Sequence, residues 1–161
     1  MFGLGKKKVE FHPVFAGRVV PVTEVPDPVF AQGMLGDGYA VIPDENADEL
    51  VVCAPVDGEV AKLFKTLHAF TMHVESGVDL LVHIGLDTVD MRGEGFTALV
   101  EKGQAVKAGT PIMRLDAKAL RASGKNLITP VVFTEKVQVK SVVVHEGEAG
   151  LDAVAATVTL A

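Results

Sequence analysis

FKTLHAFTMHVESGVDLLVHIGLD, residues Phe64–Asp87, contains two strand-like segments on either side of Ser76-Gly77. Because Ser-Gly can form a two-residue turn, this stretch predicts a β-hairpin with Glu75 opposite Val78. Further from the turn, three more pairs are expected to face each other: Phe70 with His83, His68 with Gly85, and Thr66 with Asp87.

The second strand of this hairpin shows which face is buried. Apolar side chains occupy every second position, namely Val78, Leu80, Val82, Ile84 and Leu86, as expected for the core side of a strand. The paired residues then lie on the other face, toward solvent or a partner. His68 and His83 become diagonal neighbours, about 7–8 Å apart at the backbone, so that their rings can meet. His73 has the opposite parity and is predicted to point away from them.

The surroundings of the two histidines predict a chemical role. The hydroxyl of Thr66 is placed to fix the tautomer of His68, and the carbonyl of Gly85 is open to an N–H of His83. Apolar side chains on the same face indicate a docking surface; these are Phe64, Phe70, Met72 and Leu81. A solvated histidine pair without a role is the alternative that the residues alone leave open.

Composition limits the classes of protein. The chain has 161 residues, of which 48% are hydrophobic and 22% charged, as in one ordinary globular domain. A net charge of −6 argues against nucleic acid as a partner and favours a protein with a basic face. The single cysteine, Cys53, excludes an intrachain disulfide and a cysteine-cluster metal site, and it fits a reducing, cytoplasmic location. No apolar run approaches the roughly 20 residues of a membrane span, so no stable membrane insertion is expected.

Short valine-rich segments separated by glycine and proline predict an all-β sandwich or barrel. The expected strands are 18–22, 39–42, 50–54, 60–64, 78–84 and 137–144. Two short helices are also expected. One covers Asp116–Ala122 with Asp116 as its cap, and the other covers Gly95–Lys102.

Two segments of the sequence recur. PVFAGRV from Pro13 returns as PVDGEV from Pro55, and Val106–Leu115 is echoed weakly by Leu151–Leu160. Such repetition indicates two similar half-motifs packed together. Chance recurrence of common valines, alanines and glycines explains the same observation equally well.

Several blocks of the sequence together resemble one family. HIGLDTV (83–89), followed by GEGF (93–96), closely resembles the phosphorylation-site signature of the glucose-family enzyme IIA proteins of the bacterial sugar phosphotransferase system. Further blocks follow in the family's order: 24–30, 36–38, 54–58, 66–70, 103–109 and 129–132. The resemblance covers about residues 12–160. We therefore expect one enzyme IIA domain over 12–161 after a flexible tail over 1–11.

The resemblance implies a fold and a function. The fold is an antiparallel β-sandwich of two related motifs, the duplicated hybrid motif, with a few short helices. His83 would accept phosphate from the histidine phosphocarrier protein and pass it to a cysteine of a IIB domain, without a metal or cofactor. His68 would assist, Thr66 would orient it, and Gly85 would be the carbonyl partner of His83.

The resemblance also implies how partners are met. Asp37 and Asp87 match acidic positions beside the family's site and would meet a basic residue of an incoming partner. Regulatory target proteins are further partners that the resemblance allows. The chain departs from the family pattern in a turn over Pro13–Gly17 that is one residue longer and in an extended stretch over Asp44–Glu49.

Other functions fit the sequence less well. His83 and Asp87 match a His-x-x-x-Asp pattern that could belong to a zinc peptidase of the lysostaphin-like class, which has a related fold. A catalytic zinc needs three protein ligands, and the His-x-His motif of those enzymes is absent. Biotinyl and lipoyl carriers need a lysine at a hairpin tip, and none is apparent. A purely regulatory binding protein stays open.

Overall fold

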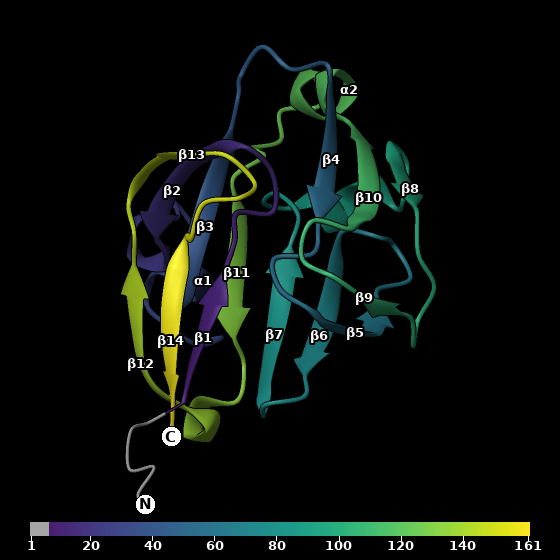
Figure 1. Cartoon of the computed structure of the whole chain (residues 1–161). Coiled ribbons are helices and arrows are strands. Elements are labelled where there is room, and N and C mark those ends of the chain that lie inside the picture. The colour runs from purple at the N-terminus through teal and green to yellow at the C-terminus, as the bar shows by residue number, and fades with distance from the viewer. Residues whose placement is uncertain (1–6) are drawn as a thin grey trace, which may run out of the picture.

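The structure of the chain is a computed structural model that describes residues 7–161. Strands make up most of it (Figure 1). They are β1 (Lys8–Phe11), β2 (Gly17–Pro21), β3 (Gly38–Pro43), β4 (Glu49–Cys53), β5 (Gly58–Leu63), β6 (Ala69–Val74), β7 (Val78–His83), β8 (Phe96–Ala98), β9 (Ala105–Val106), β10 (Pro111–Asp116), β11 (Thr129–Phe133), β12 (Val139–Val144), β13 (Gly147–Ala149) and β14 (Ala156–Leu160). The helices are α1 (Pro28–Ala31) and α2 (Ala117–Ala122), with 3₁₀ turns η1 (Val22–Glu24), η2 (Thr88–Met91) and η3 (Lys136–Gln138).

The strands form one large sheet and two small ones, all antiparallel. The large sheet has eight strands in the order β13-β2-β3-β11-β7-β6-β5-β9, and the small sheets have the orders β1-β14-β12 and β4-β10-β8. Figure 1 shows the two small sheets in front of the large one, β1-β14-β12 to the left and β4-β10-β8 to the upper right. Their facing side chains form one continuous core, which includes a Phe11–Phe133 contact between the layers at 4.9 Å. The predicted all-β antiparallel class is confirmed.

The strand order repeats within the chain. The half-sheet β13-β2-β3-β11 has its counterpart in β9-β5-β6-β7, and β1-β14-β12 has its counterpart in β4-β10-β8. Each half therefore has seven strands with the same connectivity, and β4 to β10 are inserted between β3 and β11. The repeated segments from Pro13 and Pro55 lead into the equivalent strands β2 and β5. This topology supports the predicted duplication.

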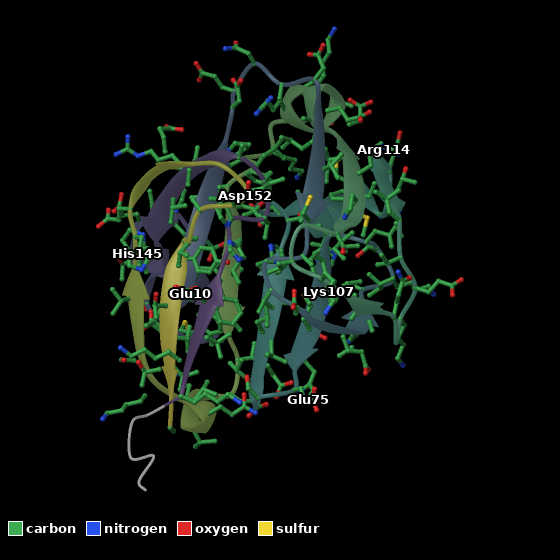
Figure 2. The ribbon with its side chains drawn as sticks, in the orientation of Figure 1. Glu10, Glu75, Lys107, Arg114, His145 and Asp152 are labelled. Atoms are coloured by element: carbon green, nitrogen blue, oxygen red, sulfur yellow. The ribbon has the colours of Figure 1, made fainter. Side chains whose placement is uncertain are left out.

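The hairpin of β6 and β7 forms, but in a register one residue away from the predicted one. Val74 pairs with Val78 and Ala69 with His83, so that the turn contains the three residues Glu75-Ser76-Gly77. Gly77 has φ of 107°, the conformation that a three-residue hairpin loop requires of a glycine. Figure 2 shows Glu75 at this turn, at the lower end of β6 and β7.

The shifted register moves every side chain of β6 to the other face. Phe70 and Met72 pair with Val82 and Leu80 and are fully buried. The prediction that Phe70 and Met72 belong to a docking surface is therefore wrong. His73 shares the face of His83 instead of pointing the opposite way, but it lies four residues along the hairpin from the Ala69–His83 pair.

Two further expectations need correction, and one helix is confirmed. Residues Lys8–Phe11, placed in a flexible tail, pair with β14 as β1; residues 1–6 lie outside the described part. The predicted helix over Gly95–Lys102 is instead β8, because Phe96 enters the core and the strand pairs with β10. The helix over Asp116–Ala122 is confirmed as α2, where Asp116 Oδ1 accepts from the N–H of Ala119 at 3.0 Å.

A short cap covers part of the outer face of the large sheet. η1 and α1 lie there over β2, β3 and β11, and they enclose a second apolar cluster. Its members are Val20, Val22, Val25, Phe30, Ala40, Leu86, Ile128 and Val132. Leu81 packs against this cluster and is partly buried. The cap thus brings α1 beside the end of β7, where His83 lies. Among residues 7–161, no helix is both long enough and apolar enough to cross a membrane.

The observed register predicts that Phe70 is a stability residue. Phe70→Ala should lower the free energy of unfolding by about 3–5 kcal/mol, because it leaves a cavity in the core. Thr71→Ala, on the partly exposed face of the same strand, should cost less than about 1 kcal/mol. Urea unfolding of both variants measures these changes. Similar, small costs for the two variants would mean that Phe70 faces outward, as in the rejected register.

Candidate functional site

His83 ends β7 and has a fixed tautomer. Its Nδ1 lies 2.7 Å from the carbonyl oxygen of Gly85. A carbonyl can only accept a hydrogen bond, so Nδ1 carries the hydrogen. In the neutral ring, the lone pair is therefore on Nε2. The expected contact between His83 and Gly85 is confirmed.

The turn after His83 holds the Gly85 carbonyl in place. Gly85 has φ of 74°, and a Cβ at this residue would meet Thr88 Cγ2 at 2.8 Å and the Asn126 carbonyl oxygen at 3.0 Å. The hydroxyl of Thr88 donates to the carbonyl of Ile84 at 2.6 Å. On the other side, the N–H of Leu86 donates to the carbonyl of Asn126 at 2.9 Å. Glycine is therefore required here both for its backbone conformation and for space.

His68 reaches the same place from the turn before β6. Leu67 has φ of 62°, and this left-handed residue turns the chain immediately before the strand, so the side chain of His68 does not follow the alternation of β6. The Thr66 hydroxyl lies 2.6 Å from His68 Nδ1. The centroids of the His68 and His83 rings are 5.3 Å apart, and the rings meet edge to face at 76°. The predicted meeting of the rings is confirmed, although the register behind it was wrong.

Aromatic rings flank the pair on both sides. Phe30 of α1 lies 5.2 Å from His83, and Phe64 lies 5.4 Å from His68, measured between ring centroids. The ammonium of Lys62 lies 4.5 Å from the centre of the Phe64 ring. His68 is only 7% exposed and His83 is partly buried. The two imidazoles are therefore shielded from bulk water without being sealed from it.

Burial lowers the pKa of both histidines. For His68, burial is the main cause, and the neighbouring charge of His83 lowers the pKa further. For His83, burial also dominates, while the Gly85 carbonyl and the carboxylates of Asp27 and Asp87 act in the opposite direction. Both rings are therefore mainly neutral at pH 7, which leaves the Nε2 lone pair of His83 free to react.

Two carboxylates provide the negative field at His83. Asp27 caps α1, where its Oδ1 accepts from the N–H of Val29 at 2.9 Å. Asp87 is exposed and has a left-handed backbone with φ of 56°. Within residues 7–161, no group of three or more His, Cys, Asp and Glu side chains is arranged to hold a metal ion.

Asp37, which was expected beside the site, lies elsewhere. Val132 of β11 pairs with Gly38 of β3 on one side and with Leu81 of β7 on the other. Asp37, one residue before Gly38, is therefore two strands away from β7. It is level with Leu80, which lies three residues before His83 along β7. Strand geometry then separates the Cα atoms of Asp37 and His83 by more than about 10 Å. The acidic residue next to His83 is Asp27, because the cap folds α1 over the sheet. The placement of Asp37 at the site is therefore corrected.

The apolar surface around the histidines also differs from the expected one. Of the four apolar residues expected on this surface, Phe64 contacts His68, whereas Leu81 is partly buried under the cap and Phe70 and Met72 are in the core. Val29, next to Phe30 in α1, and Val89 of η2, two residues after Asp87, are 40% and 48% exposed. Sequence reasoning missed them, together with Asp27 and Phe30. The Asp-Pro start of α1 is a helix-start signal that could have placed Asp27 as a cap.

The coupling of the two rings gives a prediction about their titration. His83→Gln should raise the pKa of His68 toward the ordinary value, because the charge of His83 no longer opposes protonation. The pKa should stay below about 6.5, since burial remains. NMR titration of the His68 ring protons measures the shift. The matched control is His145→Gln, which changes an exposed histidine on β12's side of the molecule (Figure 2) and should have no effect. An unchanged His68 pKa in His83→Gln would contradict the coupling.

Known proteins resemble this chain over most of its length. The sequence profile of the family described as the phosphoenolpyruvate-dependent sugar phosphotransferase system, EIIA 1, matches residues 9–139. A protein of Bacillus cereus named PTS system glucose-specific EIIA component is 48% identical over 136 residues, which are 83% of this chain and 80% of that protein. A protein of Haemophilus influenzae with the same name is 39% identical over 151 residues, 92% of this chain and 89% of that protein.

The fold agrees with these matches. A solved structure titled glucose permease IIA from Mycoplasma capricolum superposes with a TM-score of 0.85 and 34% sequence identity. The match covers 98% of this chain and 99% of that one. The profile spans more than half of the chain, and the relatives are similar well beyond the site. The chain therefore belongs to the EIIA 1 family of the phosphoenolpyruvate-dependent sugar phosphotransferase system.

Proposed function

We propose that Nε2 of His83 accepts a phosphoryl group from the histidine phosphocarrier protein and passes it to a cysteine thiolate of a IIB domain. As a family member, the protein works with other components of a sugar phosphotransferase system; these two partners are the proposed ones. The observation that carries the proposal is the 2.7 Å contact from His83 Nδ1 to the Gly85 carbonyl. This contact reserves Nε2 for reaction.

Each transfer is a displacement at phosphorus. In the first, the Nε2 lone pair of His83 forms a bond to phosphorus while the donor's N–P bond breaks and its electron pair returns to the donor imidazole. In the second, the thiolate forms an S–P bond, and the pair of the broken N–P bond returns to Nε2. No net redox change occurs, and neither a nucleotide nor a metal is needed.

The groups around His83 match the charge that develops on it. Bond formation at Nε2 while Nδ1 keeps its hydrogen makes the ring cationic. The Gly85 carbonyl, Asp27 and Asp87 favour a cationic ring, as their effect on the His83 pKa shows. Burial acts against the charge and keeps the phosphorylated ring a good leaving group. The site thus balances acceptance of the phosphoryl group against its release.

His68 is proposed to stabilise the phosphoryl group during transfer. When the Thr66 hydroxyl donates to His68 Nδ1, the hydrogen of the neutral ring is on Nε2, which then serves as a donor. Phosphoryl transfer proceeds through a loose transition state, so positioning and charge stabilisation supply most of the catalysis. A donor beside the phosphoryl oxygens supplies part of it.

The sugar, the location and any regulatory role are finer proposals. The relatives' names specify glucose, and we extend that sugar to this chain. A phosphoryl carrier between a phosphocarrier protein and a IIB domain would work in the cytoplasm. Val29, next to Phe30, and Val89, two residues after Asp87, expose apolar side chains, and the same surface would serve regulatory targets when His83 is unphosphorylated.

Phosphorylation in vitro tests the proposal. With phosphoenolpyruvate, enzyme I and the phosphocarrier protein, we expect one added phosphate by mass, stable in base and lost in acid as for phosphohistidine. His83→Ala should abolish it, and His73→Ala, on the same face of the same hairpin, should not. His68→Ala should still accept the phosphate, but roughly a hundredfold more slowly, as for loss of one oxyanion donor. A label that persists in His83→Ala, or that is acid-stable, would overturn the assignment.

The acidic flank predicts how partners approach. The double variant Asp27→Asn and Asp87→Asn should slow phosphoryl entry roughly tenfold at low salt, because charge complementarity governs encounter. Asparagine preserves the α1 cap and tolerates the left-handed backbone at residue 87. Asp37→Asn is the matched control and should leave the rate unchanged. Stopped-flow transfer at several salt concentrations measures the difference, which should shrink as salt rises. An equal effect of Asp37→Asn would contradict the docking role of Asp27 and Asp87.

A further inference from the structure

A second concave site lies between α1 and β12. Its cavity volume is about 420 Å³, within the range of pockets for small molecules. The floor is apolar and comes from Val22, Ala31, Phe133 and Val139, of which Val22 and Phe133 are buried core residues. Polar side chains of Thr23, Gln32 and Ser141 stand at its rim. The pocket has the size and the mixed lining of a metabolite site.

One residue of the pocket lining, Asp37, occupies the position in the other half of the fold that is equivalent to His68. In the histidine site, the N–H of Ile84, after β7, donates to the carbonyl of His68 at 2.7 Å. In the other half, the N–H of Phe133, at the end of the equivalent strand β11, donates to the carbonyl of Asp37 at 2.9 Å. Asp37 thus takes the place of His68, and η3 follows β11 as η2 follows β7. The pocket therefore lies beside the place that corresponds to the His68 turn in the duplicated framework.

The charge of the second site is opposite to that of the first. Lys136 of η3 and Lys140 of β12 both line the pocket and are exposed. Within residues 7–161, no carboxylate lies within 4.0 Å of either ammonium. Two free cations on a chain of net charge −6 form a local positive field suited to a dianion. Asp37, also in the lining, offers an acceptor for a ligand hydroxyl.

We propose that this pocket binds a small organic phosphate that carries hydroxyl groups. Lys136 and Lys140 hold the phosphate dianion, the floor covers the organic body, and Asp37 accepts from a hydroxyl. The site does not require phosphorylation of His83. The pocket is lined by Ala31 of α1 and by Gln32 and Gly33 directly after it, and Phe30 of the same helix contacts His83. A ligand in the pocket and the His83 ring therefore lie against the same short helix.

The test is an amide chemical-shift titration of the unphosphorylated protein, without any phosphoryl donor. The probe is glucose 6-phosphate, with glucose and inorganic phosphate as comparison ligands. We expect saturable shifts at Lys136–Ser141 and Ala31–Gly33, and binding at least tenfold weaker for either comparison ligand. The double variant Lys136→Gln and Lys140→Gln should weaken binding at least tenfold. Ser141→Phe, which narrows the pocket without changing charge, should do the same.

The matched control removes two exposed lysines elsewhere, Lys102→Gln and Lys118→Gln, and should leave the affinity unchanged. Thermal unfolding checks that all variants fold. An equal loss in the control, shifts centred on His68 and His83, equal affinity for inorganic phosphate, or no saturation at millimolar probe would each overturn the proposal. None of these results bears on phosphorylation of His83, which is measured separately.

Discussion

The hydrogen bond from His83 Nδ1–H to the Gly85 carbonyl is the constraint on which the site depends. It fixes the tautomer, and the tautomer decides which nitrogen can react. The carbonyl points at the ring only because Gly85 has a positive φ and is enclosed by Thr88 and Asn126. Asn126 precedes β11, and β11 pairs with β7, so the geometry of one imidazole is set by contacts between the two halves of the fold.

The duplicated architecture explains how a small β protein can shield two histidines without sealing them in its core. The large sheet has a core on its inner face, and only part of its outer face is covered by η1 and α1. His83 lies at the edge of this cap, between the Phe30 ring and the His68 ring. The rings are buried enough to stay neutral, while His83 is only partly buried, as the proposed transfer to and from Nε2 requires. In the other half, Asp37 takes the place of His68, and the nearby pocket is lined by Lys136 and Lys140.

The local features of the site were predictable from sequence, because they involve residues a few positions apart. Alternating apolar residues from Val78 to Leu86 identified the buried face of β7, and the contacts His83–Gly85 and Thr66–His68 each span two residues. The hairpin register was not predictable, because loops of two and of three residues ending in Gly77 differ by one position. Nothing in the local sequence decides between them; the pairing of Phe70 with the core does.

Long-range contacts account for the other differences. Asp27 approaches His83 only because α1 folds across the outer face of the sheet. Which of Asp27 and Asp37 lies beside His83 therefore depends on the position of the cap formed by η1 and α1. Lys8–Phe11 form a strand because β14, at the other end of the chain, pairs with them. The short Phe96–Ala98 segment becomes β8 because β10 offers an edge. In each case, tertiary pairing outweighed a weak local preference.

We propose that the Gly85 carbonyl reserves Nε2 of His83 for phosphate. The most direct test is NMR of the phosphorylated, ¹⁵N-labelled protein, in which coupling between phosphorus and ring nitrogen identifies the bonded atom. Phosphorus should be bonded to Nε2 of His83, with Nδ1 still bearing its hydrogen. Phosphorus bonded to Nδ1 of His83, or to either nitrogen of His68, would contradict the proposal.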